Sequence, residues 1–188
     1  MSGQTLKTVV EGLIFASDSP VSAEKLLPAF IEDVQAGEIQ AAILELKEDY
    51  EERRSALELR EVAGGWQFRT RPDLSLHILR LGHKAPPRLS RAALETLAVV
   101  AYRQPILRAE IEKIRGVDAG GVLRSLMEKD LVKVSQRNDR LPGRPMLYST
   151  TKRFLETFDL PSLSDLPSIQ EMDRMCPPAP EIRNKLFD

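Results

Sequence analysis

The sequence contains few of the side chains from which metal sites and many active sites are built. One cysteine, Cys176, and two histidines, His77 and His83, occur among 188 residues. A single cysteine excludes a disulfide within the chain, and three such side chains are too few for a thiolate or histidine zinc site. We therefore expect no metal and no cofactor, and a cytoplasmic protein.

Long apolar runs and phosphate-binding loops are also lacking. No stretch approaches the roughly 20 apolar residues that cross a bilayer, and the first residues do not have the pattern of a signal peptide. Neither a Walker loop nor a Gly-x-Gly-x-x-Gly turn occurs. Paired acids such as Glu51 and Glu52 lie among arginines, as on a solvated helix face. These absences argue against an enzyme and against a membrane protein.

Charge is distributed unevenly, although the formal net charge is only -1. Residues 84–153 carry 15 Lys and Arg against 7 Asp and Glu, whereas both flanking segments have an excess of acidic residues. A basic middle segment favours an acidic partner, which is either nucleic acid or another protein. Hydrophobic residues make up 42% of the chain, enough for folded cores.

The region from Ser90 to Thr151 has the pattern of a winged helix-turn-helix. Ser90 is typical of a helix N-cap, with Leu89 and Leu94 spaced for a hydrophobic staple, and Pro105 ends the helix. Apolar spacing then predicts two helices and a hairpin, at about 108–114, 118–129, 132–135 and 146–148. Pro142 and Gly143 are placed for a type II turn at the tip of this hairpin. The third helix is expected to bury Val122, Leu123, Leu126 and Met127.

The first half of the chain repeats this order when Pro20 is set on Pro105. Apolar spacing predicts an opening helix marked by Leu6 and Ile14, and Ser22 is placed to cap a second helix. A third helix at about 38–54 and two strands at 57–62 and 66–70, joined at Gly64-Gly65, are predicted to follow. The expected fold class is α+β, mainly α, with two tandem winged helix-turn-helix domains, each of three helices plus a β-hairpin. Expected boundaries are 1–82, a linker at 83–88, 89–160, and a flexible tail at 161–188.

Several surface candidates follow from side-chain type. Val9, Val10, Leu13 and Phe15 cover more than one face of the first helix, so either a second copy or a tightly packed monomer covers them. Tyr102 and Arg103 are residue types enriched in protein contacts, although a core tyrosine is the alternative. The basic residues Arg124 and Arg144 can meet phosphates, pair with an acidic protein, or only keep the surface soluble.

DNA recognition is disfavoured by the third helix of each half. In the first half that helix carries Glu45, Glu48 and Asp49, which repel phosphates. In the second half it has no Asn or Gln for adenine, and only Arg124 can read guanine. Sequence-specific DNA binding is therefore expected to be weak.

A series of motifs, taken in order, resembles the segregation and condensation protein B (ScpB) family. The motifs are Val10-Glu11-Gly12-Leu13-Ile14-Phe15, Gly64-Gly65-Trp66, Ala101-Tyr102-Arg103-Gln104-Pro105-Ile106, Gly121-Val122-Leu123-Arg124, Pro142-Gly143-Arg144-Pro145 and Leu163-Ser164-Asp165-Leu166-Pro167. They span roughly residues 6–167.

This resemblance implies a non-enzymatic subunit of a bacterial SMC–kleisin condensin complex that acts in chromosome condensation and segregation. It implies a homodimer that binds the kleisin ScpA, reaches the SMC ATPase through the kleisin, and touches DNA weakly or indirectly at the nucleoid. Dimer candidates are then Val9, Val10, Leu13 and Phe15, and kleisin-binding candidates are Tyr102, Arg103, Arg124, Arg144 and Tyr148. The alternative is a winged-helix DNA-binding transcriptional regulator.

Overall fold

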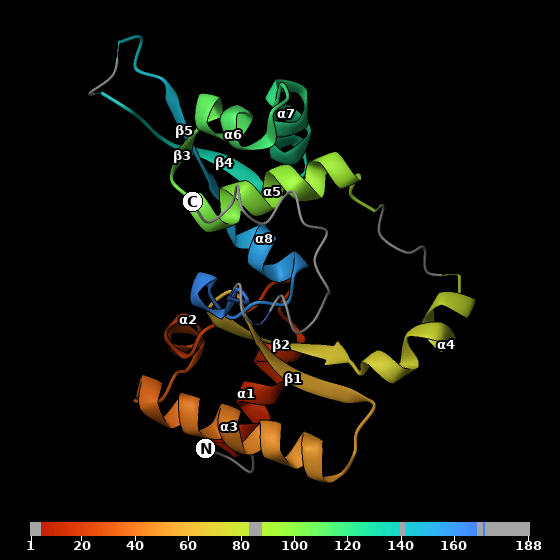
Figure 1. Ribbon diagram of the computed structural model, residues 1–188. Helices are drawn as coiled ribbons and strands as arrows, with labels where there is room; N and C mark the ends of the chain where they lie inside the picture. The colour runs from red at the N-terminus through yellow and green to blue at the C-terminus, as the bar shows by residue number, and fades with distance from the viewer. Residues whose placement is uncertain (1–4, 83–87, 140–141, 169–170, 172–188) are drawn as a thin grey trace. The chain divides into compact units, whose positions relative to one another are not determined.

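The chain forms two structural units. The computed structural model describes residues 5–82, 88–139, 142–168 and 171. One unit, here called the N-terminal unit, contains residues 1–86 and 159–162, and the C-terminal unit contains residues 87–158 and 163–188. Figure 1 shows the elements of each unit. Nearly all of the expected linker at 83–88 and most of the expected tail lie outside the described residues.

The N-terminal unit packs three helices against a hairpin. Its elements are α1 (Leu6–Phe15), α2 (Ala23–Leu26), η1 (Leu27–Ala29), α3 (Ala36–Glu52), β1 (Leu57–Val62), β2 (Gly65–Thr70), η2 (Pro72–Leu74) and α4 (Ser75–Arg80). The Ser22 hydroxyl accepts a hydrogen bond from the Lys25 amide and so begins α2 as expected. The core of this unit includes Val10, Ile14, Leu26, Ile39, Ile43, Leu46, Leu59 and Trp66.

The C-terminal unit has the same order with a three-stranded sheet in place of a two-stranded one. Its elements are α5 (Arg91–Arg103), β3 (Ile106–Leu107), α6 (Arg108–Arg115), α7 (Gly120–Glu128), β4 (Val132–Arg137), β5 (Met146–Thr150), α8 (Lys152–Thr157) and η3 (Leu163–Asp165). The Ser90 hydroxyl caps α5 through the Ala93 amide. Gly116 ends α6 in the left-handed conformation, with φ of 73°, which glycine adopts without strain.

Strand pairing confirms that the two units repeat one fold. Val21, the residue after Pro20, bridges to Trp66 of β2, and Ile106, the residue after Pro105, pairs with Tyr148 of β5. In both units a short segment between the first two helices therefore lies beside the returning strand of the hairpin. This is the order of a winged helix-turn-helix, so the chain is a tandem winged-helix protein.

Some details differ from the sequence-based expectations. The first hairpin turns at Ala63 and Gly64, both with positive φ, and Gly65 already belongs to β2. Leu94 and Val134 are exposed, and Val122 and Met127 are only half-buried.

Residues of the expected tail make specific hydrogen bonds with the two units. The amides of Ala63 and Gly64 donate to the carbonyls of Leu160 and Pro161, both at 2.8 Å. Residue Pro167 accepts a hydrogen bond from the Tyr102 hydroxyl at 2.7 Å. Proline and acidic residues suggested disorder, but the backbone carbonyls of this segment satisfy donors that would otherwise lack partners.

Candidate protein-binding site

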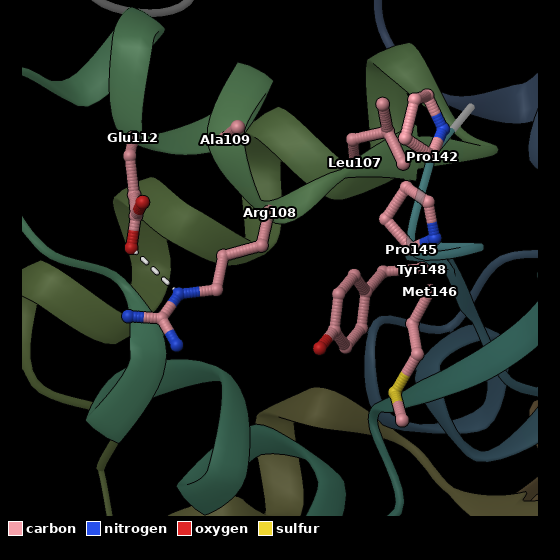
Figure 2. A pocket seen from close by; sticks show the side chains of 8 residues that line it. All are labelled: Leu107, Arg108, Ala109, Glu112, Pro142, Pro145, Met146 and Tyr148. Atoms are coloured by element: carbon pink, nitrogen blue, oxygen red, sulfur yellow. Dashed lines mark hydrogen bonds and ion pairs between the residues drawn. The ribbon is translucent and has the colours of Figure 1, made fainter. Parts of the chain in front are cut away.

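The C-terminal unit contains an apolar groove between the start of α6 and the tip of the β4–β5 hairpin, here called the wing groove. Its volume is about 550 Å³, and it is lined by Leu107, Arg108, Ala109, Glu112, Pro142, Pro145, Met146 and Tyr148. Figure 2 shows Leu107, Pro142 and Pro145 grouped together, with the Tyr148 ring and the Met146 side chain beside them. A space of this size accepts one or two apolar side chains of a partner.

Local hydrogen bonds, strand pairing and a turn position the walls of the groove. The Glu110 carboxylate accepts a hydrogen bond from the Leu107 amide at 2.9 Å and so fixes the start of α6. Tyr148 is held by pairing of its strand with β3 on one side and β4 on the other. Gly143, with φ of 79°, makes the turn that brings Pro142 and Pro145 to the groove.

A cluster of charged side chains, which includes Arg108 and Glu112, lines part of the groove. The Arg108 guanidinium donates to Glu112 at 2.7 Å and to Asp118 at 2.5 Å. The same Glu112 oxygen accepts the Ala119 amide at 3.0 Å. The Arg108 hydrogen bond lowers the pKa of Asp118, so this carboxyl is ionised at neutral pH. Figure 2 shows Arg108 reaching toward Glu112 and away from the apolar side chains.

This cluster also determines what the start of α7 presents to a partner. Asp118 accepts the Gly120 amide, and a Cβ at Gly120 would lie 2.7 Å from the Arg108 guanidinium. The first turn of α7 therefore lies next to two carboxylates, Glu112 and Asp118. Phosphate groups are repelled by such a surface, whereas an apolar peptide is not.

The five predicted kleisin-binding residues do not form one site. Tyr148 lines the wing groove, and Arg144 is adjacent in sequence to Pro145, exposed and paired with Asp139 at 2.5 Å. Tyr102 is half-buried, and burial raises the pKa of its hydroxyl, which donates to Pro167. Arg103 and Arg124 are exposed on α5 and α7.

Sequence reasoning missed most of the residues that line the groove. Leu107, Ala109 and Met146 come from three elements, and only long-range pairing of β3 with β5 brings them together. The sequence contains one signal for this groove: Met146 and Tyr148 lie two residues apart in a predicted strand and therefore share a face of it.

The predicted dimer residues are divided between core and surface. Val10 is fully buried in the N-terminal unit, so it has no surface to offer a second copy. Val9 and Leu13 are half-buried, and Leu13 packs against the core. Phe15 is 71% exposed, and its ring lies in a T-shaped arrangement with the Phe68 ring, at 6.4 Å between centroids.

Within residues 5–82, 88–139, 142–168 and 171, there is no group of three or more His, Cys, Asp or Glu side chains placed to hold a metal ion. Among the same residues, every helix is too short or too polar to cross a bilayer.

The fold defines a tandem winged-helix protein, and its C-terminal unit carries an apolar groove. Comparison with known proteins is consistent with this class. The family model described as segregation and condensation complex subunit ScpB matches residues 8–169. The chain belongs to this family, whose proteins act in chromosome partition and condensation as part of an SMC complex.

The chain is similar to several individual proteins. Segregation and condensation protein B of Syntrophotalea carbinolica is 44% identical over 183 residues, which cover 97% of this chain and 90% of that protein. The crystal structure of ScpB from Mycobacterium tuberculosis is 34% identical, covers 82% of this chain and 95% of that chain, and has a TM-score of 0.38. A dimer of an ScpB N-terminal domain complexed with an ScpA peptide is 27% identical, covers 43% of this chain and 92% of that chain, and has a TM-score of 0.37.

Proposed function

We propose that this chain is a non-enzymatic subunit of a bacterial SMC–kleisin complex and that it binds the kleisin ScpA as a homodimer. The observation that carries the proposal is the wing groove, whose lining is mostly apolar and comes from β3, α6 and the β4–β5 hairpin. Such a groove suits side chains of a polypeptide. The complex works in the cytoplasm at the nucleoid, and the SMC ATPase is reached through the kleisin.

Binding in this proposal orders an extended segment of the kleisin. Apolar kleisin side chains enter between Leu107 and Tyr148, and acidic kleisin residues lie near the exposed Arg144. The segment loses conformational freedom on binding, so affinity depends on a few well-buried side chains. The chain thereby sets the path of the kleisin without any chemical step of its own.

Filling the wing groove tests this proposal. Ala109 lies in the groove near the start of α6 and is exposed, so an indole there occupies the space without disturbing the core. We expect Ala109→Trp to weaken kleisin binding at least tenfold, about 1.4 kcal/mol, in isothermal titration calorimetry. The control is Lys129→Trp, an exposed substitution at the end of α7 that does not line the groove. Equal affinities for both variants would remove the groove from the kleisin interface.

The alternative function, a DNA-binding regulator, has less support. The first turn of α7 lies beside Glu112 and Asp118, and α3 of the N-terminal unit is acidic. A winged helix that reads DNA brings its third helix against phosphates. If DNA were the partner, log affinity would fall with log salt by about 0.9 for each phosphate neutralised. We expect only weak duplex binding without sequence preference.

A further inference from the structure

The Tyr148 hydroxyl is a hydrogen-bonding group held in the wall of the wing groove. Tyr148 is only 8% exposed, and among the residues that the structure describes its hydroxyl has no hydrogen-bond partner. In Figure 2 its ring projects between the Arg108 and Met146 side chains, and the hydroxyl oxygen points away from Pro145. A buried polar group without a partner costs free energy, so an occupant that accepts this hydrogen bond gains affinity.

The remaining walls of the groove favour a proline as occupant. Leu107, Pro142 and Pro145 have no polar side-chain atoms, and the Arg108 guanidinium is already bound to two carboxylates. A residue that buries its amide hydrogen against these side chains leaves that donor without an acceptor. Proline has no amide hydrogen, and the carbonyl before it is available to accept from a hydroxyl. Segments of the pattern Pro-x-x-Pro bind aromatic-lined grooves for these reasons and lose little conformational entropy.

The chain itself contains a segment of this pattern. Residues 176–180 are Cys-Pro-Pro-Ala-Pro, so Pro177 and Pro180 are spaced as Pro-x-x-Pro. This run, here called the proline run, lies outside the described residues. Its side chains carry no charge, which suits the apolar walls of the groove.

The described chain before the proline run lies within reach of the groove. The Pro167 carbonyl accepts a hydrogen bond from the Tyr102 hydroxyl at 2.7 Å. Burial and then the charge of Glu171 raise the pKa of the same hydroxyl, which places Glu171 near Tyr102. Leu107 of the groove follows Tyr102 by five residues, at most about 18 Å of chain. Six residues join Glu171 to Pro177 and span up to about 20 Å, so the prolines can reach the groove.

We infer that the proline run occupies the wing groove of its own chain, with its prolines against the apolar walls and the Tyr148 hydroxyl donating to one of its carbonyls. Because run and groove belong to one chain, the effective concentration of the run at the groove is high. The run therefore competes with any other polypeptide for the groove. That this competitor is the kleisin rests on the proposed function, whereas occupation of the groove by the run does not. The apparent kleisin affinity then depends on the fraction of chains whose groove is open.

A spin label on Cys176 tests this contact in the full-length chain. Cys176 is the only cysteine and directly precedes the proline run, so a nitroxide can be attached there without any substitution. We expect the methyl signals of Leu107 and Met146 in NMR spectra to lose at least half of their intensity relative to the chemically reduced label. The double variant Pro177→Ser with Pro180→Ser should recover most of this intensity.

Two matched variants separate the parts of the contact. Ala179→Ser changes a residue between the same prolines and should leave the signal loss as in the wild type. Tyr148→Phe removes only the hydroxyl and should reduce the loss. A Tyr148→Phe chain with the full wild-type loss would reject the hydrogen bond to the run.

The outcomes also separate this inference from the proposed function. Unchanged Leu107 and Met146 signals in the labelled wild type would overturn the inference, whatever the kleisin does. Signal loss in an isotope-labelled Cys176→Ser chain mixed with spin-labelled chain would overturn it as well, because the run would then come from a second copy. If both proposals hold, the double proline variant should bind the kleisin about threefold more tightly in calorimetry. Signal loss in the wild type together with an unchanged kleisin affinity would support the inference and reject the groove as the kleisin site.

Discussion

At the scale of single residues, the most informative side chain is Arg115 of α6. Its guanidinium is 9% exposed and donates to Glu95 at 2.8 Å and to the Thr96 hydroxyl at 2.7 Å. Thr96 is itself fully buried in α5. This polar contact ties α6 to α5 inside a mostly apolar unit, where a missing partner leaves polar atoms unsatisfied.

Removing this guanidinium should destabilise the C-terminal unit. We expect Arg115→Ala to lower the free energy of unfolding by about 2 kcal/mol, because Glu95 and Thr96 lose a charged donor away from solvent. The matched control is Arg91→Ala, whose side chain is 81% exposed and pairs with the same Glu95 at 2.9 Å. Solvent screens that pair, so its loss should cost about 0.5 kcal/mol or less. Urea titrations that give equal losses for the two variants would contradict this reasoning.

The ion pairs of Glu95 predict that the stability of the C-terminal unit depends on pH. Hydrogen bonds from Arg91 and then Arg115 lower the pKa of Glu95 below its ordinary value of 4.5. A carboxyl with a lowered folded pKa contributes stability above its unfolded pKa and loses it as the pH falls through the folded pKa. We therefore expect Glu95→Gln to be less stable than the wild type at neutral pH and to lose less stability below about pH 4.5. Parallel acid unfolding curves would contradict this assignment.

At the scale of elements, the close contact of β2 with the segment after Pro20 defines the N-terminal unit. A Cβ at Gly65 would lie 2.8 Å from the backbone of Pro20 and Val21, and the Val21 and Trp66 backbones exchange two hydrogen bonds. Only glycine permits this approach, which explains the glycine at the start of β2.

Replacing Gly65 by alanine, with a second glycine as control, tests this contact. We expect Gly65→Ala to destabilise the chain by about 2 kcal/mol, because backbone atoms must move to admit the methyl group. Gly12→Ala is the control, since its Cβ would meet nothing within 4 Å inside α1. That substitution should stabilise the chain by about 0.5–1 kcal/mol through helix propensity. Thermal unfolding that ranks the two variants in the opposite order would contradict the packing described for β2.

Most elements could be predicted from sequence because their signals are local. Ser22 and Ser90 mark helix starts, and the repeat about Pro20 and Pro105 predicts two copies of one fold. The turn of the first hairpin was predicted one residue too late, because Ala63 adopts a positive φ that alanine does not favour.

The binding surfaces were harder to predict because they depend on contacts between distant residues. The wing groove forms only when β3 pairs with β5, and burial of Val10 depends on packing by α3 and β2. Composition suggested disorder beyond Asp159, but it carried no information about the donors at Ala63 and Gly64.

At the scale of the whole molecule, two winged-helix units serve protein recognition in this account. The N-terminal unit places an acidic α3 and an apolar α4 at its surface. The C-terminal unit holds an apolar groove next to a basic hairpin. In the proposed function a second copy binds one unit and the kleisin binds the other, so each repeat of the fold would have a distinct partner.

The most direct test is to titrate the wild-type chain with the kleisin of the same genome and, separately, with duplex DNA, at about 50 and 200 mM salt. Binding dominated by an apolar groove depends little on salt, whereas a protein with 6–10 phosphate contacts loses about 10³–10⁵ in affinity over this range. The account predicts kleisin binding at both concentrations, with affinities within about tenfold of each other. Undetectable kleisin binding, together with tight duplex binding that falls steeply with salt, would contradict it.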